Sequence, residues 1–336
     1  MTLPIRHRYL PYAEAAKVDN IVVDGGSNDR TVLALSHWPK SGTPKPLKAD
    51  TSVEIVFRYL DDSAFHQSVE AVSNDHFDED GLIALFIMVE PEAALSLRDL
   101  LIDTAHAGDF ATYRSRQAAR IAFTLSTLAD RKTSPLPREA FPAAYPDYCI
   151  EMYRRLVPMI AEIATETERF RDLWADEDAL LEQSERAIEK GEITLEELAD
   201  AGLVVARIPS SWQERPAHRF AQDRRVLCHP MAIHNRSHLN RVATVCGRQL
   251  WFGYRYESWV QVVNDPPPER VDLKALAAEL TGRESNGAIW KFDGVEQITP
   301  ALYPTDAAQS TIDADRFVEL LSEALRTGAP AWDPYD

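Results

Sequence analysis

The stretch Val72-Ser-Asn-Asp-His-Phe-Asp-Glu-Asp-Gly81, followed by the apolar run Leu82-Ile-Ala-Leu-Phe-Ile-Met-Val89, decides how this chain folds. A short strand is expected to end near residue 73, and a buried helix to begin near residue 80. Between them, four carboxylates and one imidazole crowd into six residues: Asp75, His76, Asp78, Glu79 and Asp80. Such a loop is stable as a solvated acidic helix N-terminus, or with a divalent cation among the carboxylates.

Two apolar segments upstream of this loop have the same pattern of a strand followed by a polar turn. Residues 20–24 are a β-branched run that ends in Asp24 before two glycines, and residues 31–35 are a second run that leads to His37. Apolar residues at helical spacing follow at 53–60, 82–89 and 97–107. This alternation predicts an α/β fold with a mainly parallel sheet and helices on both faces. The polar ends of parallel strands meet at one edge of such a sheet.

The remaining sequence differs in character from this first part. Residues 111–200 are largely helical in spacing, with a proline-rich segment at 135–146 and a long charged stretch at 166–199, and β-rich runs return after Gly202. We therefore predict an α/β domain over residues 1–130, a helical connector over 131–200 and a smaller α+β domain over 201–336. Residues 111–200 are compatible with a lid, a linker or the interface of a homodimer.

The composition restricts the partners of the chain. Its 336 residues are 45% hydrophobic and 26% charged, as in a globular protein, and its formal net charge is -17. This charge disfavours binding to long duplex nucleic acid, but it allows a small phosphorylated molecule held by metal ions and a few arginines. Three widely spaced cysteines without a CxxC pair fit a reducing compartment. Because the sequence shows no signal peptide and no membrane-spanning run, we expect a cytoplasmic protein without a membrane partner.

Metal-competent residues follow each predicted strand of the first domain. They are Asp24, His37, the acidic loop and, further along the chain, Asp103 or Asp109. Two divalent ions about 3.5–4 Å apart require a bridging carboxylate, further carboxylates and one or two imidazoles. The chain contains these carboxylates and imidazoles, although an acidic cap at the start of a helix would explain some of the carboxylates in the same loop.

Three of these segments resemble motifs of the DHH phosphoesterases, a family that binds two manganese or magnesium ions. His76-Phe-Asp78-Glu-Asp80-Gly81 resembles the motif His-x-Asp-x-Asp-Gly, which opens a helix in that family. Val22-Val-Asp24 resembles the family's strand-end acid, and Ser36-His37-Trp38-Pro39 resembles its Asp-His-His-Pro motif with only the middle histidine retained. The motifs occur here in a rearranged order, and the Asp-His-His triplet is degraded.

The resemblance implies a site with two ions, Mn²⁺ or Mg²⁺, bridged by Asp24. A further family motif places an acid near a phenylalanine. Asp109 fits it better than Asp103 does, because Gly108 frees the preceding turn and Phe110 can anchor it. The metal ligands implied by the resemblance are Asp24, His37, His76, Asp78, Asp80 and Asp109, and the catalytic residues among them are Asp24, His37, Asp78 and Asp80.

The second half more distantly resembles the substrate-binding domain of the same family. It lacks that domain's glycine-rich histidine loop, which the segment from His229 to His238 replaces. The substrate-binding residues that the resemblance implies are Arg236, His234, Arg255 and His238.

The function predicted from these features is a metal-dependent phosphoesterase that hydrolyses a small phosphorylated substrate or a short oligonucleotide. A catalytically inactive DHH-like module that binds a nucleotide or another protein is the alternative, and the degraded triplet favours it. A third hypothesis is a different metal-dependent hydrolase, for example of amides, that uses the same loop.

Overall fold

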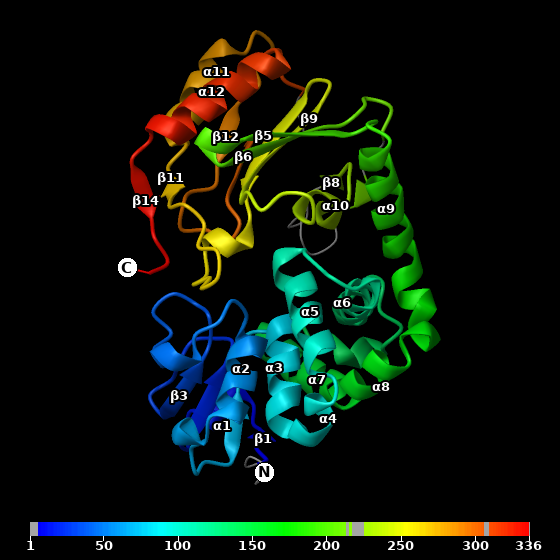
Figure 1. Cartoon of the computed structure of the whole chain (residues 1–336), viewed down its shortest axis with the longest axis vertical. Helices are drawn as coiled ribbons and strands as arrows, with labels where there is room; N and C mark the ends of the chain where they lie inside the picture. The colour runs from blue at the N-terminus through cyan, green and yellow to red at the C-terminus, as the bar shows by residue number, and fades with distance from the viewer. Residues whose placement is uncertain (1–5, 213–214, 217–224, 306–308, 336) are drawn as a thin grey trace. The chain divides into compact units, whose positions relative to one another are not determined.

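The computed structural model of the chain describes residues 6–212, 215–216, 225–305 and 309–335 (Figure 1). These residues form two compact units. The first contains the chain up to Ala179 together with Gln261–Asn264, and the second contains Leu180–Val260 and the chain from Asp265 onward. None of the helices in the described ranges has both the length and the apolar character needed to cross a membrane.

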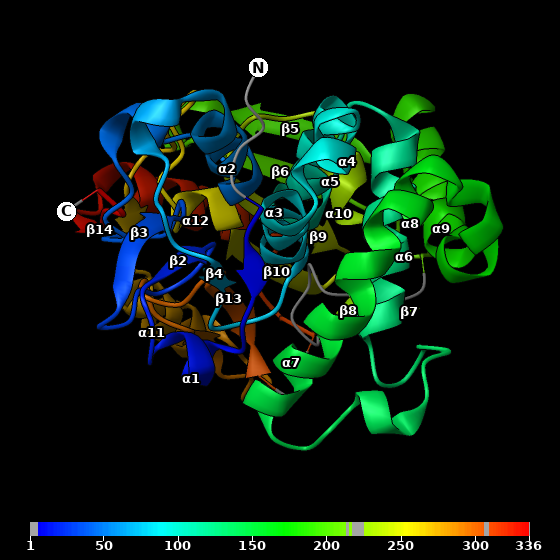
Figure 2. The same ribbon diagram turned by 90° about the horizontal axis from the view of Figure 1, so that it is seen from below.

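A four-stranded parallel sheet in the order β1-β4-β2-β3 is the base of the first unit (Figure 2). Each neighbouring pair of strands runs parallel, so the carboxyl ends of all four strands lie at the same edge. The inner strands β2 and β4 are buried along their whole length, as parallel strands usually are. The strands are β1 (Arg8–Tyr9), β2 (Asn20–Val23), β3 (Thr31–Leu35) and β4 (Ala71–Ser73).

Helix α3 lies in the core of the first unit. All but the last of its residues are buried, and a helix that is apolar on every side is stable only in an interior. Asp78 caps α3 by accepting a hydrogen bond from the backbone N–H of Gly81. Thr51 and Glu54 form a reciprocal capping box at the start of α2. The first helices are α1 (Tyr12–Ala15), α2 (Ser52–Asp61), α3 (Glu79–Val89), α4 (Pro91–Leu95), α5 (Arg98–Phe110) and α6 (Arg116–Ala129).

The division into units differs from the predicted domain boundaries at residues 130 and 200. Met152 and Tyr153 of α7 and Ile163 of α8 are fully buried in the same core as α3, so this segment packs with the parallel sheet instead of forming a separate connector. The helices of this region are α7 (Tyr145–Leu156), α8 (Ile160–Thr165) and α9 (Arg171–Glu189).

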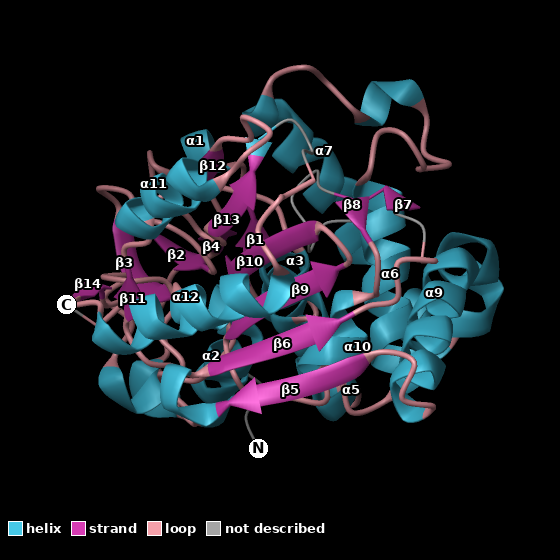
Figure 3. Cartoon of the chain, turned by 90° about the horizontal axis from the view of Figure 1, so that it is seen from above, coloured by secondary structure: helices cyan, strands magenta, loops and turns pink. Residues whose placement is uncertain are grey.

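A mixed six-stranded sheet in the order β12-β13-β10-β9-β6-β5 forms the second unit (Figure 3). Only β6 and β9 pair in parallel. Helices α11 and α12 pack on the sheet through Leu280, Phe317 and Leu321. The strands of this sheet are β5 (Thr194–Leu198), β6 (Leu203–Arg207), β9 (Arg241–Cys246), β10 (Gln249–Tyr254), β12 (Trp290–Phe292) and β13 (Ala301–Pro304). The other elements are β7 (Arg215–Pro216), β8 (Arg225–Val226), α10 (Pro230–His234), β11 (Arg270–Val271), α11 (Lys274–Arg283), α12 (Ala314–Thr327) and β14 (Pro330–Trp332).

The predicted fold class is confirmed: the chain is α/β, with a parallel sheet in the first unit and mixed strands in the second. One local prediction is wrong, because the charged stretch that was expected to be helical up to residue 199 ends its helix at Glu189. Thr194–Leu198 then forms the edge strand β5, paired with β6 along its length. The backbone hydrogen bonds to β6 outweigh the helical preference of the local sequence.

Candidate metal centre

Asp24 follows β2 directly and lies at the centre of the site. Its backbone has φ 46°, a left-handed conformation that aspartate tolerates better than most residues do. The side chain is buried, and its Oδ1 accepts a hydrogen bond of 2.8 Å from Ser52 Oγ. Its Oδ2 is buried without a hydrogen-bond partner among the described residues, 3.4 Å from His76 Nε2. A buried carboxylate oxygen in this state is costly unless a cation lies beside it.

His37 follows β3 and is oriented by the main chain. Its Nδ1 donates a hydrogen bond of 2.7 Å to the carbonyl oxygen of Asp50, and a carbonyl can only accept, so Nδ1 carries the proton. In the neutral ring, Nε2 then presents its lone pair. That atom lies 3.5 Å from Asp24 Oδ1, 3.6 Å from Asp109 Oδ2 and 3.8 Å from Asp80 Oδ2. These separations exceed ordinary hydrogen bonds and suit an ion held between the atoms.

The acidic loop contributes its residues from the N-terminus of α3. Asp80 is fixed by the first turn of α2, because the backbone N–H groups of Ser52 and Val53 donate to its two oxygens at 2.7 and 2.9 Å. Asp78 accepts from the N–H of Gly81 through Oδ1 at 2.8 Å, and its Oδ2 lies 2.9 Å from His76 Nε2. Asp78 is therefore a helix cap, as one interpretation of the loop expects, and it also faces an imidazole. A cation among the carboxylates stays a prediction.

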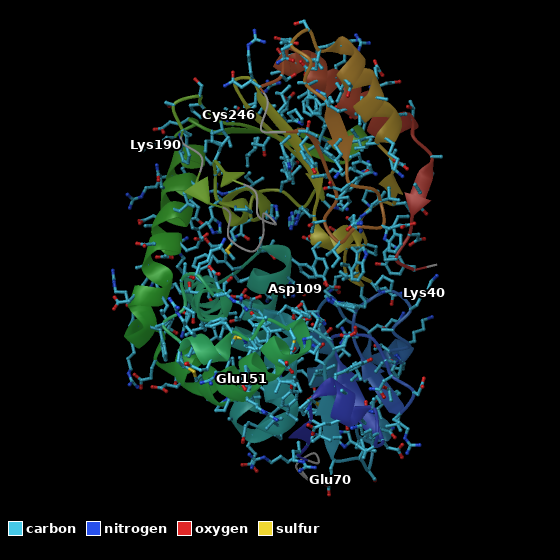
Figure 4. The ribbon with its side chains drawn as sticks, turned by 180° about the vertical axis from the view of Figure 1, so that it is seen from behind. Lys40, Glu70, Asp109, Glu151, Lys190 and Cys246 are labelled. Atoms are coloured by element: carbon cyan, nitrogen blue, oxygen red, sulfur yellow. The ribbon has the colours of Figure 1, made fainter. Side chains whose placement is uncertain are left out.

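Asp109, and not Asp103, joins the cluster. Asp109 lies near the end of α5 (Figure 4), its side chain is 2% exposed, and its Oδ2 has no hydrogen-bond partner within the described part of the chain. Asp103 accepts 2.8 Å hydrogen bonds from the backbone N–H groups of Arg114 and Ser115, so it caps a loop. The expectation that Gly108 frees a turn is wrong, because α5 continues through it to Phe110.

The side chains form two overlapping sets of potential ligands. One set is Asp24, His37 and Asp80, and the other is Asp24, His76 and Asp78; within each, one ligand atom per residue lies within 4.8 Å of the others. Asp24 belongs to both sets, as a bridging carboxylate must. Asp109 adds a further carboxylate on the His37 side. Carboxylate oxygens suit Mn²⁺ and Mg²⁺, and imidazole nitrogen also suits Zn²⁺ and iron.

The charges of the site are unbalanced when no cation is present. Burial, followed by the charges of Asp78 and Asp80, holds the pKa of Asp24 well above its usual range. Burial and the charges of Asp80 and Asp78 likewise raise the pKa of Asp109 far above normal. Burial would lower the pKa of His76, but the charge of Asp78 and the nearby carboxylate of Asp24 raise it well above its usual value. Without a cation, the cluster therefore favours bound protons, which a divalent ion would displace on binding.

Gly81 is required by the close approach of α3 to the end of β2. A Cβ atom on this residue would lie 2.3 Å from Asn74 Nδ2 and 3.0 Å from both Asp24 Oδ2 and the Tyr153 hydroxyl. Tyr153, from α7, donates a hydrogen bond of 2.6 Å to the carbonyl oxygen of His76. The segment predicted to be a connector thus supports the acidic loop.

Sequence reasoning missed several residues that surround the cluster. Ser52 and Asp50 directly precede the helical pattern at 53–60, and Tyr153 lies in the segment predicted to be a connector. The Trp38 ring lies 4.6 Å from the ring of His76, centroid to centroid. The only available signal was the Thr51–Glu54 capping pattern, which marks the helix start but not its contact with Asp80.

The four predicted substrate-binding residues all belong to the second unit. Arg255 is buried and donates to the carbonyl oxygens of Ser237 and Leu239 at 3.0 and 3.5 Å. It also pairs with Glu257. Arg236 forms an exposed ion pair of 3.0 Å with Glu189.

His234 and His238 lie at the end of α10 and in the loop after it. His234 is the last residue of α10 and is partly buried, whereas His238 is exposed. A contact of any of the four predicted residues with substrate stays a prediction.

The comparison with known proteins gives a family without a described activity. None of the curated proteins matches the chain. Residues 5–336, nearly the whole chain, match the family of unknown function DUF6687. The chain therefore belongs to the DUF6687 family.

Proposed function

We propose that this protein is a divalent-metal-dependent phosphoesterase that hydrolyses a small phosphorylated molecule or a short oligonucleotide. The observation that carries the proposal is the pair of ligand sets that share Asp24 at the carboxyl edge of the parallel sheet. Sites for two ions about 3.5–4 Å apart are typical of enzymes that cleave phosphate esters.

The donor set fits two ions of manganese or magnesium type. Asp24 would bridge them, with His37, Asp80 and Asp109 on one side and His76 and Asp78 on the other. When bound, two such ions acidify a water molecule and neutralise the charge of the phosphoryl group. The protein residues hold the ligands in place: Ser52 N and Val53 N fix Asp80, and Asp50 O fixes the His37 ring.

Accessibility within the cluster differs between its two sides. The side chains of His37, Asp80 and Asp109 are at most 2% exposed, whereas those of His76 and Asp78 are 17% and 13% exposed. A phosphate would therefore reach the site from the side of the acidic loop. The net charge of -17 favours a small substrate whose phosphate is bound by the ions over a long polyanion.

The resemblance to DHH phosphoesterases supports the same proposal. His76, Asp78 and Asp80, which carry the family's His-x-Asp-x-Asp-Gly pattern, lie in one cluster with Asp24. A location in the cytoplasm belongs to the proposal as well, and the three cysteines are all buried thiols, as is usual in a reducing compartment.

Hydrolysis of bis-p-nitrophenyl phosphate by purified protein, with and without Mn²⁺, tests the proposal. We expect turnover that requires the ion and that Asp24→Ala and Asp78→Ala each reduce by at least about 100-fold. Asp130→Ala is the matched control, because Asp130 caps a turn through Lys132 N and Thr133 Oγ1 and belongs to neither ligand set. Ion binding without turnover would favour the inactive binding module, and metal-dependent cleavage of amides but not phosphate esters would favour the amide hydrolase.

A further inference from the structure

Asp50 is a buried carboxylate outside the ligand sets with an unusual number of partners. Its Oδ1 accepts hydrogen bonds from the backbone N–H groups of Val263 and Asn264 at 2.6 and 3.0 Å. Its Oδ2 accepts from Asn264 Nδ2 at 2.7 Å. Hydrogen bonds to an ionised carboxylate are stronger than neutral ones, so Asp50 is tightly fixed.

These partners come from a segment distant in sequence. Gln261–Asn264 belongs to the first compact unit although the residues on both sides of it belong to the second, and 213 residues separate Val263 from Asp50. We call this segment the strap. Gln261 adds two further contacts: its N–H donates to the carbonyl oxygen of His37 at 2.8 Å, and its Oε1 accepts from Lys48 Nζ at 2.8 Å.

The strap therefore binds both Asp50 and the backbone of His37, and these two residues define the orientation of the His37 ring. The carbonyl oxygen of Asp50 accepts from His37 Nδ1, while the side chain of Asp50 is bound by the strap. The backbone of His37 is bound by Gln261. The same hydrogen bond fixes the tautomer, so Nε2 faces Asp24, Asp80 and Asp109. Outer partners of this kind typically set the ring orientation and basicity of a ligating histidine.

We propose that Asp50 is a positioning residue, and that its attachment to the strap preforms the His37 side of the ion-binding site. The metal part of this inference rests on the function proposed above, whereas the orientation of the His37 ring does not. The His76 side has a different support, since Tyr153 and Asp75 hold that loop. Loss of Asp50 should therefore weaken one ion-binding step and spare the other.

The variant Asp50→Ala removes the three hydrogen bonds between the Asp50 side chain and the strap. Asn264→Ala removes only the bond that the exposed Asn264 side chain donates to Asp50 Oδ2. We expect Asp50→Ala to weaken the His37-side step for Mn²⁺ by about 10–100-fold, with a smaller effect in the same direction for Asn264→Ala. The step that uses His76 and Asp78 should be unchanged. Asp130→Ala again serves as the control, since it removes the carboxylate of a surface turn that accepts hydrogen bonds from Lys132 and Thr133, both outside the strap.

The second measurement uses metal-free protein labelled with ¹⁵N-histidine. In the wild type, His37 should show a protonated Nδ1 that exchanges slowly with water. In Asp50→Ala, the ring nitrogens should show mixed tautomers and faster exchange. Asn264→Ala, which removes only one of the three contacts of Asp50 and is the milder variant, should shift in the same direction.

Each result decides between the explanations. An unchanged His37 tautomer in both variants, or an equal loss in both ion-binding steps, would overturn the positioning role. If the tautomer changes as expected but the wild-type protein binds no ion, the positioning of the ring stands and the proposed phosphoesterase fails.

Discussion

Replacing Asp24 by asparagine changes the stability of the protein in opposite directions with and without metal ions. Asparagine has the same shape and its Oδ1 can still accept from Ser52 Oγ, so the contact that fixes the side chain survives. What disappears is a fully buried charge, one oxygen of which has no hydrogen-bond partner among the described residues. An uncompensated buried polar or charged group costs on the order of 1–3 kcal/mol.

The sign of this effect follows from the raised pKa of Asp24. A carboxyl group whose pKa is raised by folding contributes stability below its unfolded value of about 4, and that stability is lost as the pH rises through the folded value. At pH 8 and without metal ions, Asp24→Asn should therefore be more stable than the wild type by about 1–3 kcal/mol. The melting temperature should rise by about 2–4 °C per kcal/mol. The difference should shrink as the pH falls toward 4.

With Mn²⁺ present, the order should reverse. An ion at 100 times its dissociation constant stabilises the folded wild type by about 2.7 kcal/mol per site, and Asp24 belongs to both ligand sets. The asparagine variant should gain almost none of this. Thermal denaturation at pH 5 and pH 8, with EDTA or with Mn²⁺, measures all four cases. The reasoning is refuted if Mn²⁺ stabilises the variant as much as the wild type, or if the variant is the less stable protein in EDTA at pH 8.

Three further predictions concern the same unit. Asp103→Ala should lower the free energy of unfolding by about 2–4 kcal/mol, because two backbone N–H groups lose their acceptor, and it should keep both ion-binding steps. Asp109→Ala should weaken one ion-binding step. Equal ion binding by these two variants would contradict the assignment. Gly81→Ala places a Cβ 3.0 Å from Asp24 Oδ2. It should lower the free energy of unfolding by about 1–3 kcal/mol and weaken Mn²⁺ binding. A variant that binds Mn²⁺ as tightly as the wild type does would contradict this prediction. Because the pKa values of Asp24 and His76 are raised, Mn²⁺ binding should release protons; a binding enthalpy independent of buffer ionisation would show otherwise.

Much of the first unit could be predicted from local patterns. The run at residues 20–24 and the apolar helix after Gly81 each carry their own signal, and they are found as β2 and α3. Parallel strands place their carboxyl ends at one edge, so the proximity of Asp24, His37 and the acidic loop followed from topology alone.

The remainder depends on contacts between segments far apart in the sequence. No local pattern shows that Tyr153 supports the His76 loop or that Val263 binds Asp50 across 213 residues. The edge strand Thr194–Leu198 contains residues that suit a helix equally well, and only its partner β6 decides its conformation. The choice between Asp103 and Asp109 likewise required the position of α5, since both residues are on the same helix.

Anomalous diffraction from crystals soaked in Mn²⁺ tests the central claim most directly. We predict two manganese peaks about 3.5–4 Å apart, one among Asp24, His37, Asp80 and Asp109, and the other among Asp24, His76 and Asp78. Asp24→Asn crystals treated in the same way should lose both. Peaks that lie elsewhere, or a wild-type site that stays empty at millimolar Mn²⁺, would contradict the account.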